Sequence, residues 1–97
     1  MKNKIITHVE LSINPELIEE VIQKAKITRD TILLEDGCEA FNLTRKKEEP
    51  NTFVIFAIYT SKQSYDWHLG QDYVKSFFGF LEGKLMSAPT VTYLTEV

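Results

Sequence analysis

The residues best suited to chemistry lie close together in the second half of the chain. Tyr59, Tyr65, Trp67, His68 and Tyr73 fall within a span of fifteen residues. Aromatic side chains form apolar sites with a few polar tips, so a group of this kind suits a small aromatic ligand. Imidazole gains and loses a proton near neutral pH, and His68 is therefore the candidate general base.

The expected position of His68 bears on this role. If the residues around it are helical, His68 shares a side with Tyr65 and Leu69 and points toward a sheet. Burial disfavours the charged imidazolium and leaves a neutral ring that can accept a proton. A core histidine that bonds to a backbone carbonyl or a tyrosine hydroxyl fits the same spacing. Trp67 falls on the opposite side of that helix, where it can serve an interface instead of a ligand.

Other kinds of site find little support in the sequence. The strong ligands for a soft or borderline metal are His8, Cys38 and His68, and their spacing matches no zinc-binding motif. The four glycines form neither GxGxxG nor a Walker loop. Cys38 is a candidate nucleophile, although a thiol without an activating neighbour more often behaves as a small buried hydrophobe. We therefore expect a site with no metal and no cofactor.

Four segments have the composition of β-strands. Apolar residues alternate with polar ones in the first two, and Thr, Val and Tyr dominate the last. The predicted strands cover residues 5–13, 38–45, 53–59 and 90–97. The third is apolar without alternation, which a strand tolerates only when both of its faces are covered, so we expect it to be a central strand. Helices can cover one face, and no residues remain for a second sheet, so we expect a second copy of the chain to cover the other.

Two helical regions separate these strands. Asn14 and Pro15 are typical of a helix start, and Gly37 follows the end of that helix with an expected positive φ. Ser61 can cap the second region, which resumes near Asp72 after an interruption. The order βαββαβ predicts an α+β, ferredoxin-like antiparallel sheet with the helices on one face.

The composition describes one globular domain over residues 1–97. The chain is 43% hydrophobic and 26% charged, has a formal net charge of -3 at pH 7 and contains one cysteine. A mildly acidic chain with dispersed cations lacks the basic patch that attracts nucleic acid or an anionic membrane surface. No apolar run is long enough to cross a bilayer as a helix. Since a single thiol also points to a reducing compartment, we expect a cytoplasmic protein with neither nucleic-acid nor membrane partners.

A family resemblance rests on five parts of the chain: Glu35-Asp36-Gly37-Cys38, Phe53 to Tyr59, Ser61-Lys62-Gln63, His68 and Tyr73-Val74-Lys75. Together they resemble the antibiotic biosynthesis monooxygenase-like family over nearly the whole chain. The resemblance implies a homodimer, a dimeric α+β barrel in which two ferredoxin-like sheets pack face to face. His68 occupies the family's histidine position, whereas Tyr73 and Ala57 stand where many members have a second histidine and a glutamate.

The resemblance also implies an activity, which is the oxygenation of a small quinol-like or anthrone-like aromatic by dioxygen without metal, flavin or haem. A base would deprotonate the substrate, and hydroxyl donors would position its oxygen. The expected site residues are a catalytic pair, His68 and Tyr73, and four substrate-binding aromatics, Tyr59, Tyr65, Trp67 and Phe77. The alternatives are a relative that degrades or isomerises a small signalling molecule, a non-catalytic dimeric binding module, and a haem-degrading enzyme.

Overall fold

The computed structural model describes residues 3–97, so Met1 and Lys2, the basic start of the chain, lie outside the described residues. Its sheet has four strands, which are β1 (Ile5–Ser12), β2 (Cys38–Arg45), β3 (Thr52–Tyr59) and β4 (Thr90–Leu94). They pair in the order β2-β3-β1-β4, each antiparallel to its neighbours. The prediction of a ferredoxin-like α+β fold with β3 as a central strand is confirmed.

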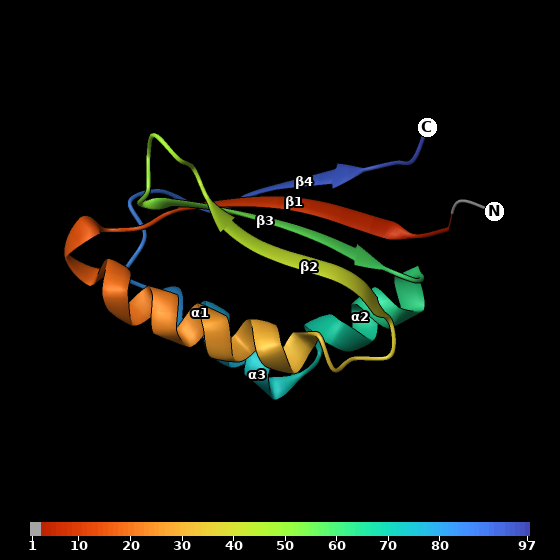
Figure 1. Ribbon diagram of the computed structural model, residues 1–97. Helices are drawn as coiled ribbons and strands as arrows, with labels where there is room; N and C mark the ends of the chain where they lie inside the picture. Colours follow the sequence, from red (N-terminus) through yellow and green to blue (C-terminus); the bar gives the residue numbers. More distant parts are fainter. Residues whose placement is uncertain (1–2) are drawn as a thin grey trace.

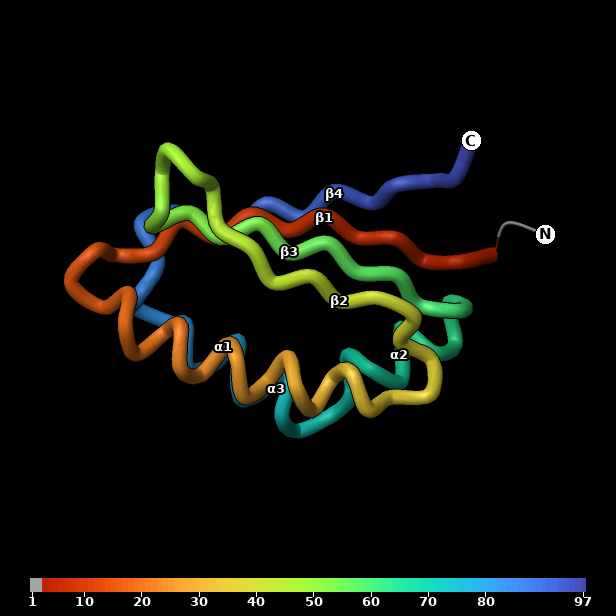
Figure 2. The backbone as a smooth tube through the Cα atoms, viewed as in Figure 1, coloured from red at the N-terminus to blue at the C-terminus, as the bar shows by residue number. Residues whose placement is uncertain are grey.

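The helices lie on one face of this sheet (Figure 1). They are α1 (Ile18–Ile32), α2 (Lys62–Leu69) and α3 (Asp72–Leu81), and a short 3-10 helix, η1 (Pro15–Leu17), precedes α1. The backbone trace shows two layers, with α1 and α3 side by side beneath the strands (Figure 2). None of the helices in residues 3–97 combines the length and the apolar character that crossing a membrane requires.

The starts of the helices follow from their capping residues. Asn14 Oδ1 accepts a hydrogen bond from the amide of Glu16 at 3.0 Å, and Pro15 opens a 3-10 turn. The α-helix itself begins at Ile18 rather than at Pro15, because the first turn keeps the tighter 3-10 geometry that is frequent at helix ends. Ser61 Oγ accepts from the amide of Ser64 at 3.1 Å, which confirms it as the cap of α2.

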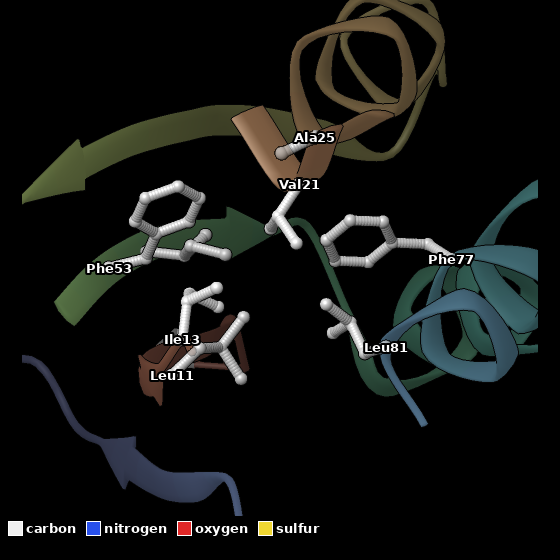
Figure 3. Packing of buried hydrophobic residues seen from close by; sticks show 8 residues of the cluster. Leu11, Ile13, Val21, Ala25, Phe53, Phe77 and Leu81 are labelled. Carbon is white, nitrogen blue, oxygen red and sulfur yellow. The ribbon is translucent and has the colours of Figure 1, made fainter. Parts of the chain in front are cut away.

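The core fills the space between the sheet and the helices (Figure 3). Alternation in the central strands turns every second side chain toward this space, including Leu11 of β1 and Phe53 of β3. The apolar stripe of α3 supplies Phe77 and Leu81 from the opposite layer. The other buried members of this cluster are Ile13, Val21, Ala25 and Ile55. These contacts attach α1 and α3 to the sheet.

The opposite side of the sheet, called here the outer sheet face, carries apolar residues that no helix in the described chain covers. Val54, Phe56 and Ile58 of β3 alternate with its buried residues and stay partly exposed. By strand register, Phe56 lies between His8 of β1 and Asn42 of β2. The lack of polar alternation in this strand therefore has a structural reason, because one apolar face packs on the helices and the other lies on the outer sheet face.

Candidate active site

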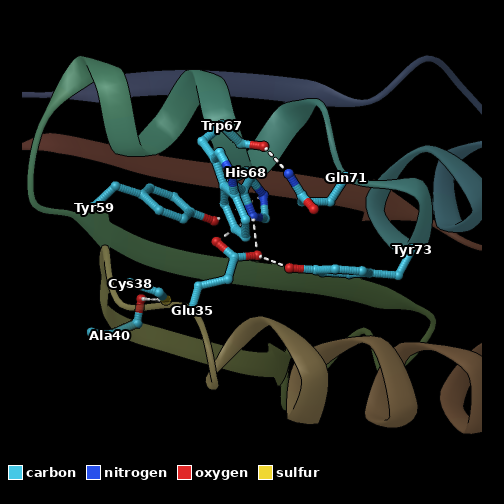
Figure 4. A network of polar contacts seen from close by, with 8 residues as sticks. All are labelled: Glu35, Cys38, Ala40, Tyr59, Trp67, His68, Gln71 and Tyr73. Carbon is cyan, nitrogen blue, oxygen red and sulfur yellow. Dashed lines mark hydrogen bonds and ion pairs between the residues drawn. The ribbon is translucent and has the colours of Figure 1, made fainter.

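His68 is a buried residue of α2 whose two ring nitrogens contact other side chains (Figure 4). Nδ1 lies 2.9 Å from Oε2 and 3.1 Å from Oε1 of Glu35, in the loop that follows α1. An ionised carboxylate only accepts hydrogen bonds, so Nδ1 carries the proton of this contact. In a neutral ring, Nε2 then has a lone pair that can accept a proton.

Two tyrosines complete a connected set of polar groups around this ring. The hydroxyl of Tyr59, on β3, lies 3.1 Å from His68 Nε2 and donates to it when the ring is neutral. The hydroxyl of Tyr73, on α3, donates to Glu35 Oε2 at 2.6 Å. Burial raises the pKa of both phenols, so both stay protonated at neutral pH. We call Glu35, Tyr59, His68 and Tyr73 the histidine array.

A cavity of about 300 Å³ lies between the sheet and the helices. Its walls are mostly apolar and include Leu43 and Ile55 of the sheet. Three of its lining residues, Tyr59, Tyr65 and His68, carry polar groups on aromatic rings that lie close together. The centre of the Tyr65 ring is 5.2 Å from that of the Tyr59 ring and 6.2 Å from that of the His68 ring. An apolar pocket of this size with a few polar groups suits a small aromatic ligand. Within residues 3–97, no three histidine, cysteine or acidic side chains gather in a group that could hold a metal ion.

The structure brings four of the predicted site residues to the cavity and leaves two outside its lining. Those that line it are Tyr59, Tyr65, His68 and Phe77. Tyr73 instead contacts Glu35 and is not among the lining residues. Trp67 is 55% exposed and is also absent from the lining, which agrees with its place on the opposite side of the helix from Tyr65.

Glu35 is a member of the site that has no predicted role, although it opens one of the segments that carry the family resemblance. It is only 8% exposed, and its carboxylate contacts both His68 and Tyr73. In the sequence it is part of the acidic stop after the first helix, and nothing periodic marks it as buried. Ala57, where the family resemblance leads one to look for a glutamate, is a small residue of the cavity wall. The carboxylate of this site therefore comes from the loop after α1 and not from β3.

Gly37 allows this loop to pack closely against α2, and the reason for a glycine here differs from the predicted one. Among the glycines of residues 3–97, Gly83 is the one with a positive φ, so the positive φ predicted for Gly37 is wrong. A Cβ atom added to Gly37 would instead overlap the Cβ atom of Ser64 on α2. The position requires glycine because the loop and the helix approach each other closely, two residues after Glu35.

The Gly37→Ala variant is expected to be less stable than the parent protein by about 1–3 kcal/mol, because the added methyl group forces the loop away from α2. Gly79→Ala is the matched control, since Gly79 is an exposed residue of α3 with no atom within 4 Å of an added Cβ. That change is expected to add about 0.5–1 kcal/mol of stability. Urea unfolding followed by circular dichroism measures both. Equal stability of Gly37→Ala and the parent would contradict the close approach.

Cys38, the candidate nucleophile, is expected to react slowly in the folded protein. Burial, with a further contribution from the negative charge of Glu35, raises the pKa of its thiol. The thiolate is the reactive form, so a raised pKa leaves less of it at neutral pH. Iodoacetamide should therefore alkylate the folded protein more slowly than the urea-unfolded protein at the same pH, and the folded rate should rise as the pH is increased. Equal rates near neutral pH would show that the thiol is reactive after all.

Comparisons with known proteins agree with this architecture. A family model described as antibiotic biosynthesis monooxygenase matches residues 4–79, which is more than half of the chain. A search of the curated proteins finds no match.

Solved structures from several organisms share the fold. A Caulobacter crescentus protein, provisionally named an antibiotic biosynthesis monooxygenase, is 25% identical with a TM-score of 0.92, and the match covers 99% of this chain and 92% of that one. A Nitrosomonas europaea protein with the same provisional name is 12% identical with a TM-score of 0.93, covering 100% and 93%. A conserved protein from Methanosarcina mazei is 20% identical with a TM-score of 0.92, covering 99% and 95%. Since the family model matches most of the chain, from β1 into α3, the chain belongs to the antibiotic biosynthesis monooxygenase family.

Proposed function

We propose that this protein is a cofactor-independent monooxygenase that oxidises a small quinol-like or anthrone-like aromatic, with His68 as the general base. The proposal rests on one observation. A buried imidazole, paired with the carboxylate of Glu35, lies in the wall of an apolar cavity of about 300 Å³. Membership of the family, and fold neighbours that are named as monooxygenases, support an oxidoreductase.

An ionisable aromatic can supply the electrons for such a reaction. Loss of a proton to His68 leaves an electron-rich anion, which passes one electron to dioxygen. The two radicals combine to form a carbon–oxygen bond and a peroxide, and the peroxide takes back the proton from the imidazolium. Cleavage of the O–O bond leaves one oxygen on the carbon as a carbonyl. The other oxygen departs as water, together with the two hydrogens that the substrate loses.

The surroundings of His68 suit these steps. The carboxylate of Glu35 balances the charge of the imidazolium that forms when the ring takes up a proton. The hydroxyls of Tyr59 and Tyr65 belong to cavity-lining residues and can donate to a developing oxyanion. The apolar walls favour binding of an aromatic ring and of dioxygen, which carries no charge. Phe77, also in the lining, adds aromatic contact area.

Oxygen uptake with a panel of hydroquinones and anthrones tests the proposal. The protein is expected to consume dioxygen faster than protein-free autoxidation does, with one oxygen molecule used per carbonyl formed. The His68→Ala variant is expected to bring uptake back to the autoxidation rate. Uptake at that rate by the parent protein across the panel would reject the proposal and favour a binding module or the turnover of a small signalling molecule. A haem titration followed by absorbance tests the haem-degrading alternative.

We also propose that two copies of the chain pair through the outer sheet face, as in the dimeric barrel implied by the family resemblance. Val54, Phe56 and Ile58 leave apolar surface partly exposed on a central strand. A second sheet packed face to face would remove that surface from water. The proposal also fits the size of the chain, since a domain of this length buries a limited share of its own surface.

A further inference from the structure

We propose that Tyr59 takes the proton from the substrate while it passes its own proton to His68, and that Glu35 and Tyr73 are positioning residues for the imidazole. The inference rests on the proposed monooxygenase function and deepens it, because it assigns the route of the first proton transfer. In this route Tyr59 is the catalytic residue that touches the substrate, and His68 is the final proton acceptor.

The lone pairs of His68 determine which atom can accept a proton from the substrate. The contact with Glu35 at 2.9 Å places a proton on Nδ1, so only Nε2 of the neutral ring can accept one. Nε2 has a single lone pair, and the hydroxyl of Tyr59 at 3.1 Å occupies it. The oxygen of Tyr59 still has lone pairs of its own that can accept. A substrate hydroxyl in the cavity therefore meets the Tyr59 oxygen before it can reach Nε2.

Glu35 and Tyr73 hold the imidazole in the orientation that this route needs. Both oxygens of Glu35 lie within 3.1 Å of His68 Nδ1, and one of them also accepts the Tyr73 hydroxyl at 2.6 Å. The loop after α1 supplies the carboxylate and α3 supplies the tyrosine, so two separate segments act on a ring carried by α2. A partner on one ring nitrogen decides which nitrogen is free to react.

The proton transfers balance. The substrate O–H bond breaks as a new O–H bond forms on Tyr59, and the original O–H bond of Tyr59 breaks as an N–H bond forms at His68 Nε2. The products are the substrate anion, a neutral Tyr59 and an imidazolium paired with the carboxylate of Glu35. Burial raises the pKa of Tyr59, which disfavours a free tyrosinate and favours movement of the two protons together. The nearby Cys38, Tyr65 and Tyr73 also have raised pKa values, mainly through burial, and stay neutral.

Nitrogen NMR of the histidines tests the arrangement without any turnover. The chain contains two histidines, His8 and His68, so a His8→Asn variant assigns the spectrum. The relay requires a neutral His68 with its proton on Nδ1 and an Nε2 that accepts a hydrogen bond. Tyr59→Phe is expected to shift the Nε2 signal toward that of a nitrogen without a donor. A neutral ring protonated on Nε2 would overturn the relay whatever the oxygen-uptake result.

The Glu35→Gln variant tests the positioning role. An amide can donate as well as accept, so the His68 ring is expected to become a mixture of tautomers and kcat to fall by about 10- to 100-fold. Glu39→Gln is the matched control, because Glu39 is a carboxylate of β2 that pairs with Lys4 at the surface. It is expected to keep the parental spectrum and rate. The parental tautomer together with the parental rate in Glu35→Gln would remove the positioning role.

The Tyr59→Phe variant tests the relay itself and is expected to lose about 10²-fold in kcat, with a smaller change in KM. It is also expected to lose the solvent deuterium isotope effect of a two-proton transfer. Tyr65→Phe, which removes a hydroxyl that bonds to Tyr93 at 2.9 Å and not to His68, is expected to keep that isotope effect.

The possible failures can be told apart. A parental kcat in Tyr59→Phe, beside an inactive histidine variant, would overturn the relay and leave the proposed function standing. Absence of oxygen uptake by the parent protein would reject the proposed function. The tautomer of His68 measured by NMR would still show whether the hydrogen bonds of the histidine array are arranged as the relay requires.

Discussion

The His68→Asn variant is expected to fold as the parent protein does and to lose about 10²- to 10⁴-fold in kcat for oxygen uptake, the range that general base catalysis contributes. The amide nitrogen of asparagine can stand close to the place of Nδ1 and donate to Glu35, so the buried carboxylate keeps a partner. The variant has no group in the place of Nε2, and the base is lost. His68→Ala removes both functions and leaves the buried carboxylate of Glu35 with the Tyr73 hydroxyl but without the imidazole, which also destabilises the fold.

His8→Asn is the matched control for this experiment. The same substitution of histidine by asparagine can be made at His8, which lies on the outer sheet face, on the other side of the sheet from the cavity. It is expected to keep the parental rate with the same hydroquinone or anthrone. If His68→Asn shows the circular dichroism spectrum of the parent and also its rate of oxygen uptake, His68 is not the base.

A second large effect is expected from Phe56→Lys, which should convert a dimer into a monomer at micromolar concentration. Phe56 lies at the middle of the outer sheet face, in register with His8 and Asn42. A lysine there would be buried without a partner, and a twofold dimer contains the change twice. The dissociation constant is expected to rise by about 10³-fold or more. Light scattering measures the mass, which is 11.2 kDa for one chain and twice that for the dimer.

Ile27→Lys provides the control for the added charge. Ile27 is an exposed residue of α1, 64% accessible, in the helix layer and not on the outer sheet face. This variant is expected to remain a dimer, because its lysine stays in water. A parent protein that scatters light as a stable monomer at micromolar concentration would contradict the dimer itself and, with it, the explanation offered for the apolar outer face of β3.

Most of the fold follows from patterns that act over short distances. The cap at Ser61 works within one turn of helix, and its consequence is visible in four residues of sequence. The apolar run of residues 53–59 predicts a central strand, because a strand without polar alternation needs cover on both of its faces. The start at Pro15 is predicted less well, since the competition between a 3-10 turn and an α-helical turn depends on small local energies.

The candidate site follows from the sequence only in part. Helical spacing alone turns His68 and Tyr65 toward the sheet and Trp67 away from it, and the structure agrees. A core histidine bonded to a tyrosine hydroxyl, one of the alternatives from spacing, describes half of the environment of His68. The other half is the carboxylate of Glu35, which no spacing argument reveals.

By itself, the sequence determined the order of the elements, the buried side of α2 and the aromatic surroundings of the histidine. These properties depend on periodicity and capping, which act between near neighbours. The tertiary structure alone decided that Glu35 meets His68 across 33 residues and that Gly37 must be small. Those contacts depend on where the sheet places the end of α1 relative to α2, and that placement results from packing among residues far apart in the chain.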